Sequence, residues 1–225
     1  MRTLRKPRKH RAMFITFEGI EGSGKTTQIK RVHSLLTAQG CTAVMTREPG
    51  GTSIGEKIRS ILLDPDSRDM DPMAELMLYF ADRAQHLGRK IRKTLSEGTW
   101  VLCDRYFDAT LAYQGYARGL NIQLIERLHQ LVFDGFKPDI TLLLDLPPQT
   151  GLDRAWRQIK NGTRTGRETR FEEEALRFHE KVRHGYLSLA RQEPQRFKIV
   201  DASKAPDYVS ADILSVLTPF ISQRR

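Results

Sequence analysis

Eight residues near the amino terminus have the types and the spacing of a loop that binds nucleotide phosphates. Residues 19–26 read GIEGSGKT and fit the pattern G-x-x-x-x-G-K-[ST] without a mismatch. The glycines let the backbone curl until several N–H groups point at one anion. In such a loop Lys25 reaches the β- and γ-phosphates, and the hydroxyl of Thr26 is offered to Mg²⁺. The segment therefore predicts binding of nucleotide phosphates together with a magnesium ion.

The elements expected on either side of this loop fit that chemistry. Residues 13–18 are apolar and β-branched, which predicts a buried strand that ends at Glu18. After the loop, apolar residues recur at helical spacing from Ile29 to Leu36, and Gly40 ends the run. The helix would present its positive amino-terminal end to the same phosphates.

Length and composition narrow the class of protein. A chain of 225 residues, 39% hydrophobic and 28% charged, is typical of one large globular domain or two small ones. No apolar run reaches membrane-spanning length. Cys41 and Cys103 are far apart and match no metal or redox spacing, so we interpret both as reduced thiols and expect a cytoplasmic location.

The net charge of +10 is spread unevenly. Six positive residues and no acid lie in the first twelve positions, and the rest of the chain carries +4. This segment lacks the apolar core of a secretory signal. We expect residues 1–12 to be a basic extension, whether a disordered tail, a short transit peptide or a stretch ahead of a natural start at Met13. Residues 13–225 are then expected to form a single domain.

Strand and helix patterns alternate along the rest of the chain. Strands are expected over 13–18, 42–46, 100–104, 140–145 and 197–200. Helices are expected over 54–63, 72–95, 123–133, 171–192 and 206–223, with a basic helix and loop over 149–170. Strands that are apolar along their whole length are typical of a parallel sheet covered on both faces. The sequence thus predicts an α/β protein with a five-stranded parallel sheet and a crevice at the carboxyl ends of its strands.

Charged residues stand at four of the expected strand ends: Glu18, Arg47, Asp104 and Asp145. A Mg²⁺ ion between nucleotide phosphates takes a carboxylate at a strand end near the loop. We favour Asp104, because Arg105 follows it and would bring an acid and a base into the crevice together. Asp145 is the alternative, and a structural ion pair or a helix cap is the other interpretation of Asp104.

Six blocks of sequence resemble the bacterial thymidylate kinases, and the resemblance covers nearly everything from Met13 onward. The blocks are Phe17–Thr27, Thr46–Thr52, Tyr79–His86, Cys103–Tyr106, Ala112–Gly115 and Arg170–Glu172. The resemblance implies a P-loop NTPase fold with a mobile basic lid, and transfer of the γ-phosphoryl group of ATP to dTMP with Mg²⁺. Because the acceptor oxygen is already anionic, such chemistry needs positioning and charge stabilisation more than a strong base.

The same resemblance implies roles at the phosphates and the metal. Lys25, Asp104 and Arg105 take part in catalysis, and Thr26 and Asp104 hold Mg²⁺, partly through water. Glu21 aligns with an acid that orders the phosphates or the metal, whereas Glu18 is interpreted as structural. The residues expected at the ATP phosphates are Gly19, Ile20, Glu21, Gly22, Ser23, Gly24, Lys25, Thr26 and Thr27.

For the acceptor site, the resemblance implies that Arg105 and Arg59 hold the dTMP phosphate, with a surface role as the alternative for Arg59. Tyr79, where the family usually has phenylalanine, stacks on thymine. Arg83 lies one turn later on the same helix face and bonds the base edge. The other expected contacts are Glu48 near the sugar or phosphate, Thr110 at the pyrimidine edge, Tyr113 near the sugar and Gln114 close to the base.

The stretch over residues 154–170 aligns with the lid of the family. Its basic residues are Arg154, Arg157, Lys160, Arg164, Arg167 and Arg170. Members with no arginine inside the phosphate loop supply catalytic arginines from the lid, and residues 20–23 contain none. We expect Arg164, Arg167 and Arg170 to act as a group, against the alternative of a solvated charged face. A closing basic lid would also exclude water.

Two other functions stay open. One is a P-loop kinase for a different nucleotide or a deoxynucleoside, and the other is a nucleotide-dependent nucleic-acid-binding protein, suggested by the net charge. The aligned pyrimidine-pocket residues disfavour the first, and the lack of aromatic stacking motifs disfavours the second. We expect ATP and dTMP as small-molecule substrates, a homodimer by family resemblance, no membrane and no specific nucleic acid.

Overall fold

Five parallel strands form one sheet within residues 12–163 and 168–222, the part of the chain that the computed structural model describes. They are β1 (Phe14–Glu18), β2 (Ala43–Arg47), β3 (Trp100–Asp104), β4 (Ile140–Asp145) and β5 (Phe197–Asp201). The order is β2-β3-β1-β4-β5, so β1 lies at the centre of the sheet. Every residue of β1 is buried, and in β3 and β4 only the last residue is not. Burial on both faces accounts for the unbroken apolar sequence of these strands.

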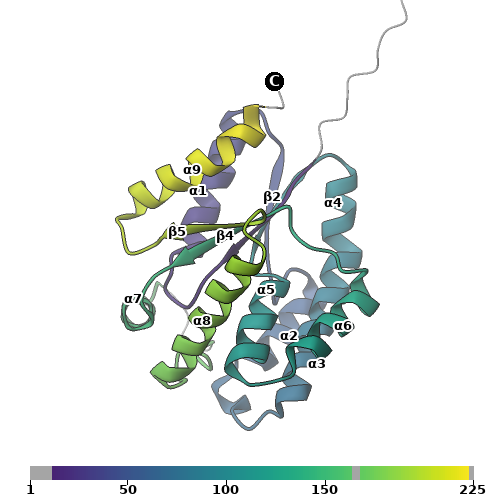
Figure 1. The fold of residues 1–225 in the computed structure, drawn as a ribbon, viewed down its shortest axis with the longest axis vertical. Coiled ribbons are helices and arrows are strands. Elements are labelled where there is room, and N and C mark those ends of the chain that lie inside the picture. Colours follow the sequence, from purple (N-terminus) through teal and green to yellow (C-terminus); the bar gives the residue numbers. More distant parts are fainter. Residues whose placement is uncertain (1–11, 164–167, 223–225) are drawn as a thin grey trace, which may run out of the picture.

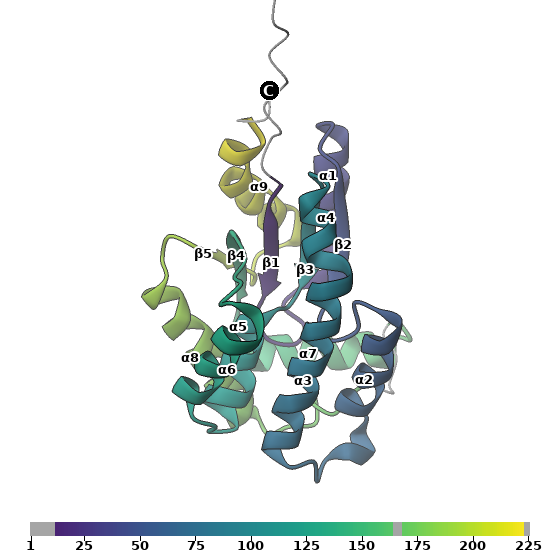
Figure 2. The ribbon, with the colours of Figure 1, turned by 90° about the vertical axis from the view of Figure 1, so that its right-hand side faces the viewer.

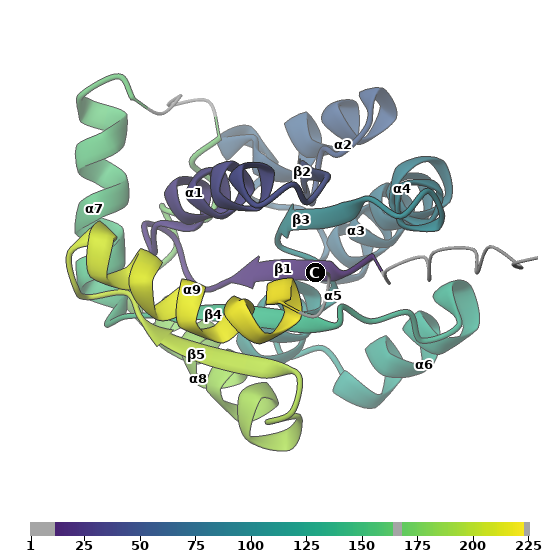
Figure 3. The same cartoon turned by 90° about the horizontal axis from the view of Figure 1, so that it is seen from above.

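Helices cover both faces of this sheet. On one face α1 (Lys25–Ala38) packs against β1, β2 and β3, while α9 (Pro206–Ser222) packs against β5 and α1. The helices on the other face include α4 (Arg92–Ser96), which contacts β3, and α8 (Leu176–Gln192), which contacts β5, as expected for right-handed crossovers between parallel strands. Figure 1 shows α1 and α9 above β4 and β5 and α8 below these two strands, and in Figure 3 α1 and α9 lie on the side nearest to the viewer.

Side-chain caps start several of the other helices. Thr52 accepts a hydrogen bond from the N–H of Gly55, and Asp71 and Asn121 cap the helices that follow them in the same way. These caps explain why the expected starts agree with the structure. The helices not yet named are α2 (Ser53–Leu63), α3 (Pro72–His86), α5 (Phe107–Thr110), α6 (Ile122–Phe133) and α7 (Pro148–Lys160).

Two π-helical stretches adjoin these helices. The first, Leu87–Ile91, joins α3 to α4, so the helix expected over 72–95 is continuous. The second, Leu111–Ala117, follows α5 in a region where the sequence predicts no helix. Six of its seven residues are buried, so it has no polar face to reveal a helical period.

The expected strands agree with the structure to within one residue at each end. The helix expected from residue 171 begins instead at Leu176, because backbone hydrogen bonds from Glu173 to Thr169 and from Glu174 to Phe171 close turns before it. Nearly all of the expected basic extension, residues 1–11, lies outside the described part.

The strands direct their carboxyl ends towards one half of the molecule. Figure 2 shows β1 running towards the half that contains α2, α3 and α7. The loop after β1 and the charged residues that end β2 and β3 therefore face the same region. This region is where an open parallel sheet holds its ligands.

Candidate active site

The predicted phosphate loop joins β1 to α1, as its chemistry requires. Gly24, which precedes the helix, has a φ of 89° and adopts the left-handed conformation that glycine tolerates. Gly22 has a φ of 67°, and a Cβ there would lie 2.0 Å from the carbonyl oxygen of Gly151 in α7. The loop can therefore pack closely on α7 only because it carries glycine at this position.

Lys25 is buried at the first position of α1 and points back into the loop. Its Nζ donates hydrogen bonds to the carbonyl oxygens of Gly19 and Ile20, at 3.0 and 2.9 Å, and to Oγ of Ser23 at 3.3 Å. Burial, assisted by the charge of Arg105, lowers the pKa of Lys25 to about 8. The ammonium is thus held within the curve of the loop, where additional negative charge would stabilise its protonated form.

Thr26 and Asp104 come together at the mouth of the loop. The Thr26 hydroxyl donates to Oδ2 of Asp104 at 3.3 Å, as the neighbouring registers of β1 and β3 allow. Asp145, the alternative metal ligand, is held in a two-bond ion pair with Arg183, at 2.7 and 2.9 Å. Within the described ranges no group of three or more His, Cys, Asp or Glu side chains could hold a metal ion. A hydroxyl and one carboxylate suit Mg²⁺ that takes its other ligands from phosphates and water.

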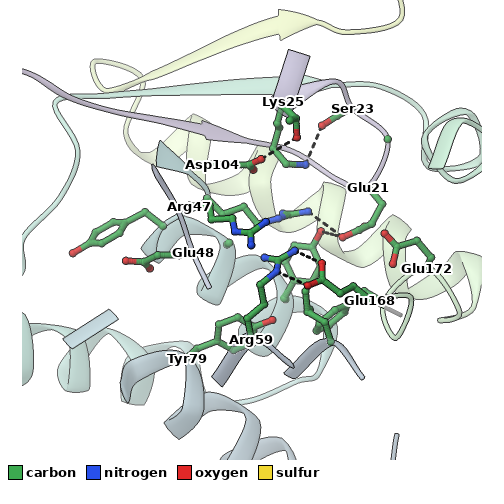
Figure 4. A pocket seen from close by; sticks show the side chains of 18 of the residues that line it. Glu21, Ser23, Lys25, Arg47, Glu48, Arg59, Tyr79, Asp104, Glu168 and Glu172 are labelled. Carbon is green, nitrogen blue, oxygen red and sulfur yellow. Dashed lines mark hydrogen bonds and ion pairs between the residues drawn. The ribbon is translucent and has the colours of Figure 1, made fainter. Parts of the chain in front are cut away.

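A cavity of about 530 Å³ extends from the loop across the carboxyl end of the sheet. Its wall contains most of the predicted site residues, from the loop, the end of β2, α2, α3 and the segment after β3. Figure 4 shows Lys25 and Asp104 at one end of this cavity and Tyr79 and Arg59 at the other. Its length and its polar wall suit a ligand that carries phosphates at one end and a ring at the other.

Glu21 links the two ends of the cavity. Its Oε1 accepts hydrogen bonds from Nη2 of Arg105 at 3.0 Å and from the hydroxyl of Tyr113 at 2.6 Å, and its Oε2 lies 3.1 Å from Nδ1 of His179. Burial alone would raise the pKa of Glu21, but the bond from His179 and the charge of Arg105 hold this pKa well below its usual range. The carboxylate is therefore ionised and stabilises the cation of Arg105.

Arg105 takes an uncommon backbone conformation, with a φ of 67°. The side chain of Arg105 is held by a chain of two hydrogen bonds. Nη1 of Arg105 donates to the hydroxyl of Tyr186 at 3.0 Å, and that hydroxyl donates to Oε2 of Glu18 at 2.7 Å. Glu18 also accepts a hydrogen bond from the N–H of Tyr106 at 2.8 Å. The buried Glu18 thus braces the segment that carries Arg105, in agreement with the structural role expected for it. Burial, together with the carboxylate of Asp108, raises the pKa of Glu18 to about 8.

Arg83 is buried on α3 within a network of polar groups. Its Nε donates to Oε2 of Glu48 at 2.9 Å, and its Nη2 donates to Oγ1 of Thr110 at 2.9 Å. Oε1 of Glu48 is bonded to Nδ1 of His86 at 2.9 Å. Nη1 of Arg83 is buried without a hydrogen-bond partner among the described residues, although Arg83 lines the cavity. This N–H group can bond an acceptor atom of a ligand.

Tyr79 and Gln114 complete the same end of the cavity. Tyr79 is half-buried on the wall, one turn of α3 from Arg83. Nε2 of Gln114 donates to Oε1 of Glu75 at 2.7 Å, which fixes the orientation of the Gln114 amide. The structure therefore brings together Glu48, Tyr79, Arg83, Thr110, Tyr113 and Gln114, as the sequence predicts.

Arg59 lines the cavity but is held by an acid. Its guanidinium donates two hydrogen bonds to the carboxylate of Glu168, at 2.9 and 2.7 Å, and a third to the carbonyl oxygen of Pro49 at 2.9 Å. This pairing reaches from α2 to the residues that precede α8. To bind a phosphate, Arg59 would exchange the carboxylate of Glu168 for the incoming anion.

Of the three arginines expected to act in the lid, the structure describes only Arg170. Arg164 and Arg167 lie outside the described residues. Arg170 is buried away from the cavity, with Nη2 2.6 Å from Oε2 of Glu75 and Nη1 bonded to the carbonyl oxygen of Leu62. The contacts of Arg170 are therefore those of a buried support.

Sequence patterns assign no role to several residues of the site. Gln158, Thr163, Glu168, Phe171 and Glu172 line the cavity from the lid region. His179 and Tyr186 in α8 support Glu21 and Arg105 from behind. The one signal that could have pointed to this pair is their spacing of seven residues, which places two polar groups on the same apolar face of a helix.

The arrangement can bind two anions. One end of the cavity offers a phosphate loop, a lysine and a hydroxyl–carboxylate pair, and Arg105 lies between that end and a polar, ring-sized pocket. Among the residues of the site that the structure describes, no strong base is paired with a nucleophile, so the geometry suits phosphoryl transfer to an acceptor that is already ionised.

Comparison with known proteins agrees with this geometry. A family model described as thymidylate kinase matches residues 17–213. The thymidylate kinase of Desulfosudis oleivorans is 55% identical over 205 residues, which cover 91% of this chain and 96% of that protein. The thymidylate kinase of Nitratidesulfovibrio vulgaris is 50% identical over 211 residues, which cover 93% and 98%. No helix in the described ranges is both long and apolar enough to cross a bilayer.

Proposed function

Because the chain belongs to the thymidylate kinase family, we propose that it transfers the γ-phosphoryl group of ATP to dTMP in the presence of Mg²⁺ and releases dTDP and ADP. In the transfer the bond between the γ-phosphorus and its bridging oxygen breaks, and a bond from that phosphorus to a phosphate oxygen of dTMP forms. The two polyanions repel each other, so the protein has to align them and to stabilise the transferred charge.

The donor side of this proposal rests on the phosphate loop. The backbone N–H groups of the loop and Nζ of Lys25 would bind the β- and γ-phosphates of ATP. The Thr26 hydroxyl and the Asp104 carboxylate, 3.3 Å apart, fit a Mg²⁺ ion bound to the same phosphates. When bound, the metal ion neutralises charge that develops on the phosphate oxygens.

Arg105 would bind the phosphate of dTMP on the acceptor side. It stands beside the phosphate loop, and Glu21 and Tyr186 hold its guanidinium from two directions. Arg59 would act as a second ligand after release from Glu168. A planar guanidinium can bind a phosphate through two hydrogen bonds, which fixes the acceptor in line with the donor.

The observation that carries the choice of acceptor is the buried N–H group of Arg83. In the proposed complex Nη1 of Arg83 donates to a carbonyl oxygen of thymine, beside Thr110 and Gln114, while Tyr79 packs on the ring. Tyr113 would lie near the sugar, where it would disfavour a ribose 2′-hydroxyl. Leaving that buried donor unpaired would disfavour acceptors whose base lacks a matching acceptor atom.

The test is a coupled assay of ADP release with ATP–Mg²⁺ and a panel of acceptors: dTMP, dUMP, dCMP, UMP, AMP and thymidine. The proposal predicts turnover with dTMP far above turnover with the others. Preference for a different acceptor would keep the phosphate chemistry and overturn the assignment of the base pocket. ATP binding without turnover of any acceptor would overturn the enzymatic function.

In the proposed cycle Arg164 and Arg167 stabilise the charge on the transferred phosphoryl group. Catalytic arginines are needed because the phosphate loop itself contributes Lys25 as its cation and holds no arginine. Arg170 stays in the protein interior with Glu75 and anchors the end of the lid.

The proposal includes a homodimer located in the cytoplasm. Exposed apolar side chains gather on α3 and α6: Met73, Met77, Leu131 and Val132. Burial of such side chains is typical of interfaces between subunits. Light scattering should give twice the mass of the chain, and the double substitution L131E/V132E should lower this mass to that of a monomer. The free, buried thiols Cys41 and Cys103 agree with a reducing compartment.

A further inference from the structure

A buried histidine in α8 contacts the acid that links the two ends of the cavity. His179 is fully buried, and its Nδ1 lies 3.1 Å from Oε2 of Glu21. Oε1 of the same carboxylate accepts from Arg105 and from Tyr113. Glu21 therefore has three side-chain partners, one from the helix after the lid and two from the segment after β3.

The chemistry of this contact fixes the position of one hydrogen on the imidazole. An ionised carboxylate only accepts hydrogen bonds, so Nδ1 of His179 must carry the hydrogen. Nε2 of His179 is buried and has no hydrogen-bond partner among the described residues. Among the described residues, the imidazole of His179 therefore forms its hydrogen bond with the Glu21 carboxylate and with no other polar group.

The fold gives this histidine a rigid support. His179 and Tyr186 are two turns apart on α8, and both face the cavity wall: His179 meets Glu21, and Tyr186 meets Arg105. Between these contacts the ring of Phe178 packs edge-on against Tyr113 at 6.1 Å. Helix α8 thus contacts Glu21 and both residues that donate to its Oε1, Arg105 and Tyr113.

We propose that His179 is a positioning residue that orients the Glu21 carboxylate, and through it Arg105, for in-line transfer between the donor and acceptor phosphates. The inference rests on the proposed function, since it assigns a role within that reaction. His179 itself contacts neither substrate: it lies behind Glu21 and does not line the cavity. Its effect is on the geometry of Arg105, and small errors in geometry reduce the rate of transfer strongly.

The first test compares three variants in the assay of dTMP phosphorylation. His179→Leu removes the donor, whereas His179→Asn can keep an N–H group at the position of Nδ1. His184→Leu makes the same change at an exposed histidine of the same helix. His179→Leu should lower kcat by about 10- to 100-fold, with the KM for ATP changed by less than about 3-fold. His179→Asn should recover most of that loss, and His184→Leu should match the wild type.

A double-mutant cycle with Glu21→Gln separates positioning from a purely structural role. If His179 acts through the Glu21 carboxylate, then His179→Leu should reduce kcat by less than about 3-fold when Glu21 is already replaced. An equal loss of kcat in both backgrounds would overturn the proposal, because the histidine would then act on stability or on other groups. Wild-type protein without any dTMP turnover would overturn the proposed function itself, which is a distinguishable result.

The tautomer of His179 gives a readout that does not depend on activity. In protein labelled with ¹⁵N-histidine, the ring should show a hydrogen on Nδ1, and Glu21→Gln should change the Nδ1 signal. A ring protonated only at Nε2 would overturn the proposal. This measurement on the wild type decides the question even if His179→Leu fails to fold.

Discussion

Replacing Arg83 by leucine tests the buried charge network that shapes the base pocket. Arg83 is 1% exposed and Glu48 is 4% exposed, and their ion pair is 2.9 Å long. After the substitution the Glu48 carboxylate keeps His86 as its side-chain partner and loses its guanidinium. Removing one partner of a buried ion pair costs about 3–5 kcal/mol of unfolding free energy. For a protein of this size that corresponds to a fall in Tm of about 6–20 °C.

The magnitude follows from an uncompensated charge, so a second substitution should reduce it. In Glu48→Gln/Arg83→Leu no carboxylate is left without its cation. The double variant should therefore lose less stability than the sum of the single variants, by more than about 1 kcal/mol. The control is Arg191→Leu, an exposed arginine of α8, which should change the unfolding free energy by about 0.5 kcal/mol or less.

Urea denaturation followed by circular dichroism measures these free energies, and the kinase assay follows function in the variants that remain folded. Arg83→Leu should also raise the KM for dTMP by about 10- to 100-fold and leave the KM for ATP nearly unchanged. The reasoning is refuted if Arg83→Leu is as stable as the wild type, or if the losses in the two single variants simply add.

Other changes probe the remaining parts of the account. Lys25→Ala should lower kcat by about 100- to 1000-fold while dTMP binding stays measurable by calorimetry; wild-type turnover would rule out the phosphate loop. Replacing Arg164 and Arg167 together by alanine should lower kcat much more than dTMP affinity. Arg170→Ala should remove the 2.6 Å ion pair to Glu75, which keeps Gln114 and a longer contact with Arg118, and lower the unfolding free energy by about 1.5–3 kcal/mol. Equal unfolding free energies for the Arg164/Arg167 double variant and for Arg170→Ala would contradict the assignment of a structural role to Arg170 alone. The pKa of Glu18 is about 8 in the folded protein, against an ordinary value of 4.5, so the folded state binds this proton more tightly than the unfolded state does. The unfolding free energy should therefore fall as the pH rises from 4.5 to 8. Glu18→Gln should flatten that slope in denaturation curves recorded from pH 5 to 9, and an unchanged slope would assign it to other groups.

Local patterns predicted the sheet and the phosphate loop because each strand, and the loop itself, depends on a short continuous stretch of sequence. The strands over 100–104 and 140–145 have the same bounds in the structure, since buried parallel strands are continuous apolar runs. The loop needs specific residue types at fixed spacing, and the structure places it between β1 and α1 as expected.

Periodicity could not decide between Asp104 and Asp145, because both residues follow an apolar run. The structure distinguishes them by their partners: Asp104 meets Thr26, while Asp145 is paired with Arg183 from a helix nearly forty residues away. The π-helical stretch at Leu111–Ala117 was not predicted, because burial on nearly all sides removes the helical alternation of polar and apolar residues.

Contacts between distant segments were beyond the reach of sequence patterns. Glu168 pairs with Arg59, and His179 reaches Glu21, across more than one hundred residues in each case. Arg170 was grouped with the lid because of its charge and position, but Glu75 of α3 holds it inside the protein. Which arginine lies in the interior depends on packing between helices, and a single sequence does not record it.

The most direct test of the central claim follows the phosphate itself. Protein, Mg²⁺, dTMP and ATP labelled at the γ-phosphate are mixed for a single turnover, and the products are separated by chromatography. The account predicts that the label appears in dTDP, at a rate that Lys25→Ala and Arg105→Ala both reduce strongly. Label in inorganic phosphate alone, or in no product from folded protein that binds ATP, would contradict the claim that this site joins a donor and an acceptor phosphate.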